Sequence, residues 1–123
     1  MNYLTVVEVL AIHEEVVRQF GGIQGVRDLG ALESALFRPQ TGYYEDLIQE
    51  AAALMESLAM NHPFLDGNKR VAFFVTDTFL RLNGSYIDCE NDATYTLFMK
   101  LFKSQNFDYQ HLESWLREHT KKI

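Results

Sequence analysis

The sequence predicts an all-α fold, a single domain of about six helices over residues 1–123. Apolar residues recur with helical spacing through most of the chain, and residues that commonly cap helices precede most of these segments. Only Ser85–Asp88 has the pattern of an extended link, and it is too short to form a sheet by itself. A chain of 123 residues with 47% hydrophobic residues is large enough to bury one core.

Capping residues and stop signals predict where each helix begins and ends. The expected helices cover about residues 5–20, 29–37, 46–61, 67–82, 91–103 and 109–122. Their N-terminal caps are Thr5 (in a capping box with Glu8), Asp28, Asp46, Asp66 and Asp108. The last helix is expected to carry Lys121 and Lys122 near its end, where cations suit the helix dipole. Pro39–Asp46 should form an ordered loop or a short hairpin.

Composition and charge exclude several classes of protein. The net charge of −6 argues against direct nucleic-acid binding, because phosphate neutralisation needs clustered Lys and Arg. The single cysteine, Cys89, cannot form an internal disulfide, fits a reducing compartment and is expected to be a small packing residue. No signal peptide and no membrane-spanning run is visible, and no His or Cys pair has the spacing of a zinc site. We therefore expect a soluble cytoplasmic protein with no membrane partner.

A polar segment between two predicted helices carries the chemistry. Its residues are Asn61, His62, Pro63, Phe64, Leu65, Asp66, Gly67, Asn68, Lys69 and Arg70. Pro63 should end the preceding helix near His62. Lys69 and Arg70 fall in the first turn of the next helix, where the dipole disfavours each cation by about 0.3–1 kcal/mol. An anion bound there would reverse that penalty, and Gly67 would let the backbone approach it closely.

A simpler interpretation of the same charges is local pairing. Asp66 stands three and four residues before Lys69 and Arg70, and such surface pairs stabilise a helix by about 0.2–0.5 kcal/mol. This interpretation leaves His62, Gly67 and Asn68 unexplained.

The segment His62–Arg70 resembles the motif of the Fic/Doc family, in the pattern His-Pro-Phe-x-Asp/Glu-Gly-Asn-x-Arg. Lys69 stands where most Fic adenylyltransferases have glycine, which is similar to the Doc (death on curing) branch. The segment Gly30–Leu36 also looks like Doc sequences, and His13 falls where they have a Leu/Ile-His pair. From the residues alone, His13 is expected to be a core histidine with one hydrogen-bond partner.

The loop offers a candidate for each need of phosphoryl transfer, and these match the roles of the family motif. His62 is the candidate general base, because imidazole can be neutral near pH 7. Asp66 offers the hard oxygen that Mg²⁺ prefers. The remaining candidates, which would hold the phosphate oxygens of ATP, are Gly67, Asn68, Lys69 and Arg70. The chain has no Gly-x-x-x-x-Gly-Lys-Ser/Thr loop, so a nucleotide must use this segment.

The resemblance implies a flap within Pro39–Asp46 that holds a target segment beside the motif. Tyr43 and Tyr44 are then candidates for substrate contact. The alternative from the residues is that these tyrosines pack the loop onto the core.

The resemblance to Doc implies a toxin of a toxin–antitoxin system that phosphorylates elongation factor Tu and arrests translation. Lys69 adds a cation where the glycine form leaves space, and Phe73 stands where adenylylating enzymes usually carry a second arginine. Both favour a Ser/Thr phosphotransferase that uses ATP and Mg²⁺ over an adenylyltransferase. A catalytically silent binding module is a third hypothesis.

Inhibition is expected in trans, from a cognate antitoxin. Inhibited Fic proteins can carry a Ser/Thr-x-x-x-Glu-Gly/Asn helix in the same chain. The nearest match, Thr41–Glu45, is followed by Asp46 and broken by Gly42, so it is a poor candidate.

Overall fold

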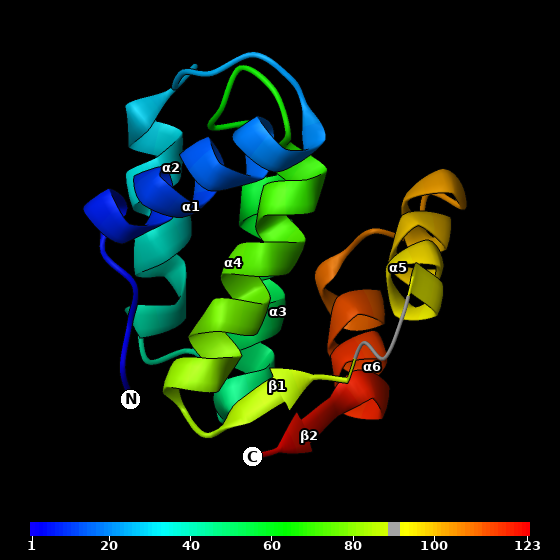
Figure 1. Ribbon diagram of the computed structural model, residues 1–123. Helices are drawn as coiled ribbons and strands as arrows, with labels where there is room; N and C mark the ends of the chain where they lie inside the picture. Colours follow the sequence, from blue (N-terminus) through cyan, green and yellow to red (C-terminus); the bar gives the residue numbers. More distant parts are fainter. Residues whose placement is uncertain (89–91) are drawn as a thin grey trace.

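Residues 1–88 and 92–123 are described in this computed structural model (Figure 1). The elements in order are α1 Val6–Phe20, α2 Leu29–Phe37, the 3-10 helix η1 Arg38–Gln40, α3 Leu47–Met60, α4 Asn68–Leu82, β1 Ser85–Ile87, α5 Asp92–Lys103, α6 Tyr109–His119 and β2 Thr120–Lys122. The expected all-α fold is therefore confirmed, with a small strand pair added. The expected role of Cys89 lies outside the described residues.

The caps form as expected for four of the helices. Thr5 and Glu8 make a complete capping box at α1. The carboxylates of Asp28, Asp46 and Asp108 each accept a hydrogen bond from the backbone N–H three residues on. Each of these bonds satisfies a donor that the first helical turn leaves without an intrahelical acceptor.

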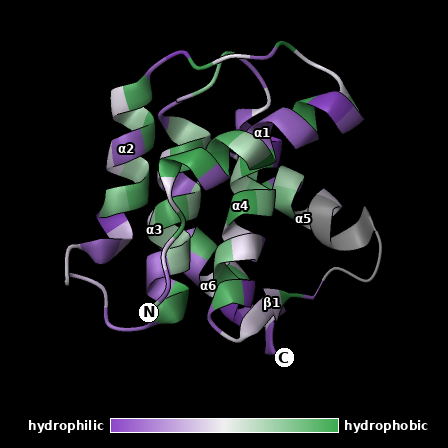
Figure 2. Cartoon of the chain, turned by 60° about the vertical axis from the view of Figure 1, so that its left-hand side comes forward, coloured by the Kyte–Doolittle hydropathy of each residue, from purple (hydrophilic) through white to green (hydrophobic). Residues whose placement is uncertain are grey.

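Helix α3 forms the centre of the domain, with α4 packed along it (Figure 1). Its long apolar stripe is buried, and the four alanines Ala51, Ala52, Ala53 and Ala59 are fully covered. Small side chains let neighbouring helices approach the axis closely. Figure 2 shows hydrophobic residues gathered on α3 and α4, with hydrophilic segments on α1 at the outside. The loops at the two ends of α3 are therefore held on a buried helix.

The C-terminal boundary of α6 differs from the expected one. Lys121 and Lys122 do not continue α6 but lie in β2, which pairs antiparallel with β1. Ser85 faces Lys122 and Ile87 faces Thr120 in this ladder. The link after α4 was too short to make a sheet alone, but it gains a partner from the far end of the chain. Residues 41–46 form an irregular loop, which is one of the two forms expected for this segment.

Tyr3 ties the N-terminal residues to α3. Its hydroxyl donates a 2.7 Å hydrogen bond to Oε1 of Glu50, a carboxylate residue that is only 7% exposed. The Tyr3 ring also stacks on Phe79 at 5.9 Å. The hydrogen bond to Glu50 raises the pKa of Tyr3 to about 12, with burial adding to the effect.

We predict that Tyr3→Phe lowers the free energy of unfolding at pH 7 by about 1–3 kcal/mol, because Glu50 loses its donor. The folded pKa of Tyr3 lies above its usual value of 10.0, so the bond contributes fully below pH 10 and is lost as pH rises toward about 12. Urea unfolding of wild type and variant should show a gap at pH 7 that shrinks between pH 10 and 12. Tyr43→Phe, on an exposed ring, is the control, and a gap independent of pH would contradict the prediction.

Candidate active site

The motif loop joins the C-terminal end of α3 to the N-terminal end of α4, at the top of the view in Figure 1. Pro63 and Phe64 are buried in it, and Phe64 is 1% exposed. The loop between α1 and α2 lies beside it (Figure 1), joined through an antiparallel bridge between Val26 and Phe64. Leu65 N donates to Gly25 O at 3.1 Å in the same pairing. Two loops distant in sequence therefore hold each other.

Asn68 closes the motif loop from inside. Its Oδ1 accepts from Phe64 N, and its Nδ2 donates to Phe64 O, both at 3.0 Å. This pair satisfies both backbone groups of a buried residue that belongs to no helix or strand. One N–H of the Asn68 amide remains for another acceptor, because an amide nitrogen carries two. Its expected phosphate contact stays a prediction.

His13 supports the loop from α1. The residue is 3% exposed, its ring stacks on Phe64 with centroids 3.8 Å apart, and Nε2 lies 2.9 Å from Asp66 O. A carbonyl can only accept, so Nε2 carries the proton. The expectation of a core histidine with one hydrogen-bond partner is confirmed.

Asp66 does not cap α4, which corrects the expected boundary. The N-cap is Gly67, in the left-handed conformation with φ 77°, and α4 begins at Asn68. The carboxylate of Asp66 instead accepts from Gly67 N at 2.9 Å and from Ile23 N at 3.1 Å. Its approach to the neighbouring loop needs Gly22, where a Cβ would lie 2.9 Å from Asp66 Oδ2. The carboxylate of Asp66 therefore binds the backbone of the α1–α2 loop and does not cap α4.

His62 lies at the surface with a positive φ of 49°. A left-handed backbone is uncommon for residues other than glycine, although histidine tolerates it better than branched residues. The following Pro63 disfavours a helical His62, so the chain leaves α3 here. His62 lines the pocket described next.

A pocket of about 400 Å³ opens at this end of the molecule. Its lining residues are His62, Leu65, Asp66, Gly67, Asn68, Lys69, Arg70 and Met99. Every motif residue that was given a candidate catalytic, metal-binding or phosphate-binding role lines it. Met99 comes from α5, which no local sequence pattern connects with the site.

The two cations of the motif each lie over an aromatic ring. Lys69 Nζ is 4.2 Å from the centre of the Phe102 ring on α5. The Arg70 guanidinium is 4.2 Å from the centre of the Phe20 ring at the end of α1. Such contacts stabilise by about 0.5–1 kcal/mol at exposed sites, similar to the dipole penalty on each cation. The rings therefore hold both cations at a helix end that would otherwise disfavour them.

The helix end itself can bind an anion. The first hydrogen bond within α4 runs from Val71 N to Gly67 O. The N–H groups of Asn68 and Lys69 precede it and have no acceptor inside the helix. The N–H of Gly67 already donates to Asp66 in this structure, so its expected phosphate contact stays a prediction. Amides, two cations and the helix dipole favour phosphate oxygens at one wall of the pocket.

Tyr43 and Tyr44 do not lie beside the motif, so their expected position is wrong. They precede α3, whereas the motif follows it (Figure 1), and a helix of 14 residues is roughly 20 Å long. Tyr44 accepts from Arg38 Nε at 2.7 Å and packs on Tyr109 of α6, while Tyr43 is 81% exposed. The segment that pairs with the motif is the loop before α2. Its glycines, Gly22 and Gly25, were the only signal available in the sequence.

Phe73 points into the core. It is 5% exposed and makes edge contacts with Phe98 of α5 and Trp115 of α6. The position is therefore a packing site for the last two helices. An arginine there would be a buried cation among aromatic rings, which costs several kcal/mol unless it is paired.

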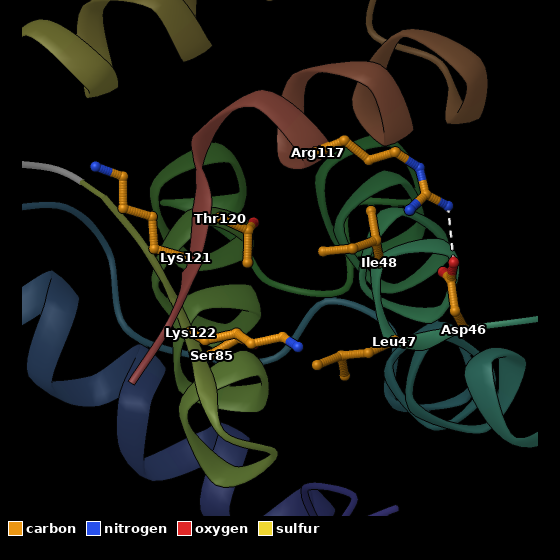
Figure 3. Close-up of a pocket in the computed structure, with 8 residues that line it drawn as sticks. All are labelled: Asp46, Leu47, Ile48, Ser85, Arg117, Thr120, Lys121 and Lys122. Atoms are coloured by element: carbon orange, nitrogen blue, oxygen red, sulfur yellow. Dashed lines mark hydrogen bonds and ion pairs between the residues drawn. The ribbon is translucent and has the colours of Figure 1, made fainter.

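A larger cavity of about 640 Å³ lies beside the strand pair, at the far end of α3 (Figure 3). Its lining residues are Asp46, Leu47, Ile48, Ser85, Arg117, Thr120, Lys121 and Lys122. Arg117 Nη2 lies 2.9 Å from Asp46 Oδ2, the contact dashed in Figure 3, and 3.2 Å from Glu113 Oε2. The charge of Arg117 is thus already matched, and no motif residue lines this cavity. The motif pocket remains the candidate active site.

No helix among the described residues is long and apolar enough to cross a membrane. Those residues also contain no cluster of three or more His, Cys, Asp or Glu side chains that could hold a metal ion. A cation at the motif would therefore need ligands from a substrate or water in addition to Asp66.

Comparison with known proteins places the chain in a family. The sequence model of the Fic/DOC family matches residues 3–80. This range includes the whole motif loop and the α1–α2 loop that pairs with it. "Toxin Doc" of Mycolicibacterium smegmatis is 47% identical over 79 residues, which cover 60% of this chain and 61% of that protein. "Protein kinase doc" of Escherichia phage P1 is 34% identical over 88 residues, 68% of this chain and 70% of that protein. The family match extends over more than half of the chain, which therefore belongs to the Fic/DOC family.

Proposed function

We propose that this protein is the toxin of a toxin–antitoxin pair and acts as a protein Ser/Thr phosphotransferase. It would transfer the γ-phosphoryl group of ATP, with Mg²⁺, to a hydroxyl of a translation factor in the cytoplasm, which by resemblance is elongation factor Tu. The observation that carries the proposal is one pocket that is lined by a histidine, a carboxylate, two cations and a helix N-terminus. The names of the two relatives, one a toxin and one a protein kinase, support the same assignment.

Different groups of the protein would accept the proton and bind the phosphates. The hydroxyl oxygen attacks the γ-phosphorus, the bond to the leaving ADP oxygen breaks, and His62 accepts the hydroxyl proton. Lys69, Arg70 and the first-turn amides of α4 would contact the phosphate oxygens. Positioning and charge neutralisation are the main demands of this chemistry, and both fit a preorganised helix end.

Asp66 is the residue that would hold Mg²⁺. Each of its carboxylate oxygens accepts one backbone N–H, which leaves further lone pairs for a cation. The carboxylate lines the pocket, and its backbone carbonyl is held by His13. Bound Mg²⁺ would neutralise charge on the phosphates, and phosphate oxygens and water would complete its ligands.

Adenylyl transfer is the alternative for the same pocket. It would require the α-phosphate, not the γ-phosphate, beside His62. Lys69 supports the kinase assignment because it adds charge at the wall that receives the transferred group. The aromatic surroundings of Phe73 support it as well, since the second arginine of adenylylating enzymes has no place there. A silent binding module would leave the matched set of base, carboxylate and cations without a purpose.

We predict that incubation with elongation factor Tu and Mg²⁺ transfers label from γ-labelled ATP and none from α-labelled ATP. His62→Ala should lower the rate by a factor on the order of 10²–10⁴, the usual contribution of a general base. His111→Ala, on an exposed residue of α6, is the matched histidine control and should keep the wild-type rate. Transfer of α-label would establish the adenylyltransferase, and absence of nucleotide binding would favour the binding module.

We predict that Lys69→Ala and Arg70→Ala abolish transfer with little change in folding. Loss of an unfavourable cation at the start of α4 and loss of a ring contact roughly cancel, so the melting temperature should stay within about 5 °C. Arg81→Ala is the control at the other end of the same helix, where a cation is favoured and pairs with Asp77. It should keep activity with a slightly lower melting temperature. A large drop in stability with activity retained would refute the anion site.

We predict that expression of the chain alone arrests growth of a bacterial host, and that His62→Ala relieves the arrest. The segment 41–46 is an irregular loop, so it does not provide the inhibitory helix found within some relatives. Control should therefore come in trans, from an antitoxin whose segment folds across the motif pocket. Growth counts and the soluble yield of both forms measure this. Normal growth with folded, unaltered protein would contradict control in trans.

A further inference from the structure

Arg27 contacts three consecutive carbonyl groups of the motif loop. Its Nη2 donates to Asn61 O at 2.9 Å, and its Nε donates to His62 O at 2.6 Å. Its backbone N–H donates to Pro63 O at 2.8 Å. One residue of the loop before α2 thus binds the backbone immediately before, at and after the candidate base.

The contact fits the unusual backbone of His62. With φ at 49°, the chain turns sharply at this residue, and the carbonyls of Asn61 and His62 both reach the same edge of one guanidinium. The planar guanidinium presents Nε–H and Nη2–H as a rigid fork, which suits two neighbouring acceptors. Its charge also lies at the C-terminal end of α3, where the helix dipole favours a cation.

Arg27 is itself held in register by its neighbours. Asp28 N donates to Pro63 O at 3.0 Å, and Leu65 N donates to Gly25 O at 3.1 Å. The side chain of Asp28 caps α2 at the same time. The start of α2 is thereby linked to the motif loop, and the side chain of Arg27 extends this link to the carbonyl of His62.

We propose that Arg27 is a positioning residue for the transfer reaction, which holds His62 in its left-handed conformation and so aims the imidazole into the pocket. This inference rests on the proposed function, because it gives Arg27 its effect through the candidate base. Arg27 is not among the residues that line the pocket. If Arg27 only capped the end of α3, its replacement would lower stability but would not change the rate of transfer in the folded protein.

The test compares Arg27→Lys with wild-type protein in the γ-label assay. Lysine keeps the charge at the helix end but donates from a single point and cannot bind both carbonyls as a fork. We expect kcat to fall on the order of 10- to 100-fold, the scale of a misplacement near 1 Å, while KM for ATP changes by less than about twofold. Arg18→Lys is the matched control, since Arg18 makes a forked contact with Glu15 on the outer face of α1. It should leave both constants unchanged.

A second variant separates positioning from folding. Arg27→Ala should show the same loss of kcat, and added guanidinium chloride at millimolar concentration should restore part of the rate, whereas sodium chloride at equal ionic strength should not. His62→Ala should gain nothing from guanidinium. In a crystal structure of Arg27→Ala, His62 should leave the left-handed region.

Three outcomes would overturn the inference while wild-type protein transfers label. These are a wild-type kcat in folded Arg27→Lys and Arg27→Ala, a loss confined to KM, and an unchanged His62 φ in a slow variant. Wild-type protein that transfers no label would instead refute the proposed function, and with it the reaction for which Arg27 positions the base.

Discussion

The loop between α3 and α4 has no regular secondary structure, so its backbone N–H and C=O groups need partners from elsewhere in the chain. Burying such a group without a partner costs about 1–3 kcal/mol, and Phe64 at the centre of the loop is almost fully buried. The side-chain amide of Asn68 binds both backbone groups of Phe64, and the imidazole of His13 binds the carbonyl of Asp66. Arg27 donates to the carbonyls of residues 61, 62 and 63. The position of every candidate catalytic group depends on these partners.

The same constraint explains why the two loops at this end of the molecule are inseparable. Gly25 and Val26 pair with the motif loop as a short antiparallel bridge, and Ile23 N binds the carboxylate of Asp66. The α1–α2 loop can approach Asp66 this closely because position 22 is glycine, since a Cβ there would lie 2.9 Å from Asp66 Oδ2. A loop that seemed a simple connection between two helices is thus part of the candidate site.

Helices α5 and α6 contribute through aromatic packing. Phe73 joins α4 to Phe98 and Trp115, and the same layer places Phe102 under the ammonium of Lys69. These helices lie beyond residues 3–80, the range that the family match covers. The part of the pocket wall that α5 provides therefore comes from residues outside the family match, and Phe102 of the same helix contacts Lys69.

The sequence by itself determined most of the helices and the residues of the candidate site, because caps, stop signals and the motif are local patterns. Thr5, Asp28, Asp46 and Asp108 cap the helices where their spacing predicted, and the motif residues with a candidate catalytic, metal-binding or phosphate-binding role all line one pocket. Only the tertiary structure decided which distant segments meet. Asp66 bonds to Ile23 instead of capping α4, and residues 120–122 pair with β1. The loop that flanks the motif precedes α2, whereas Tyr43 precedes α3 and so lies at the end of that helix away from the motif. Each of these outcomes depends on a hydrogen-bond partner or a direction in space that no local spacing encodes.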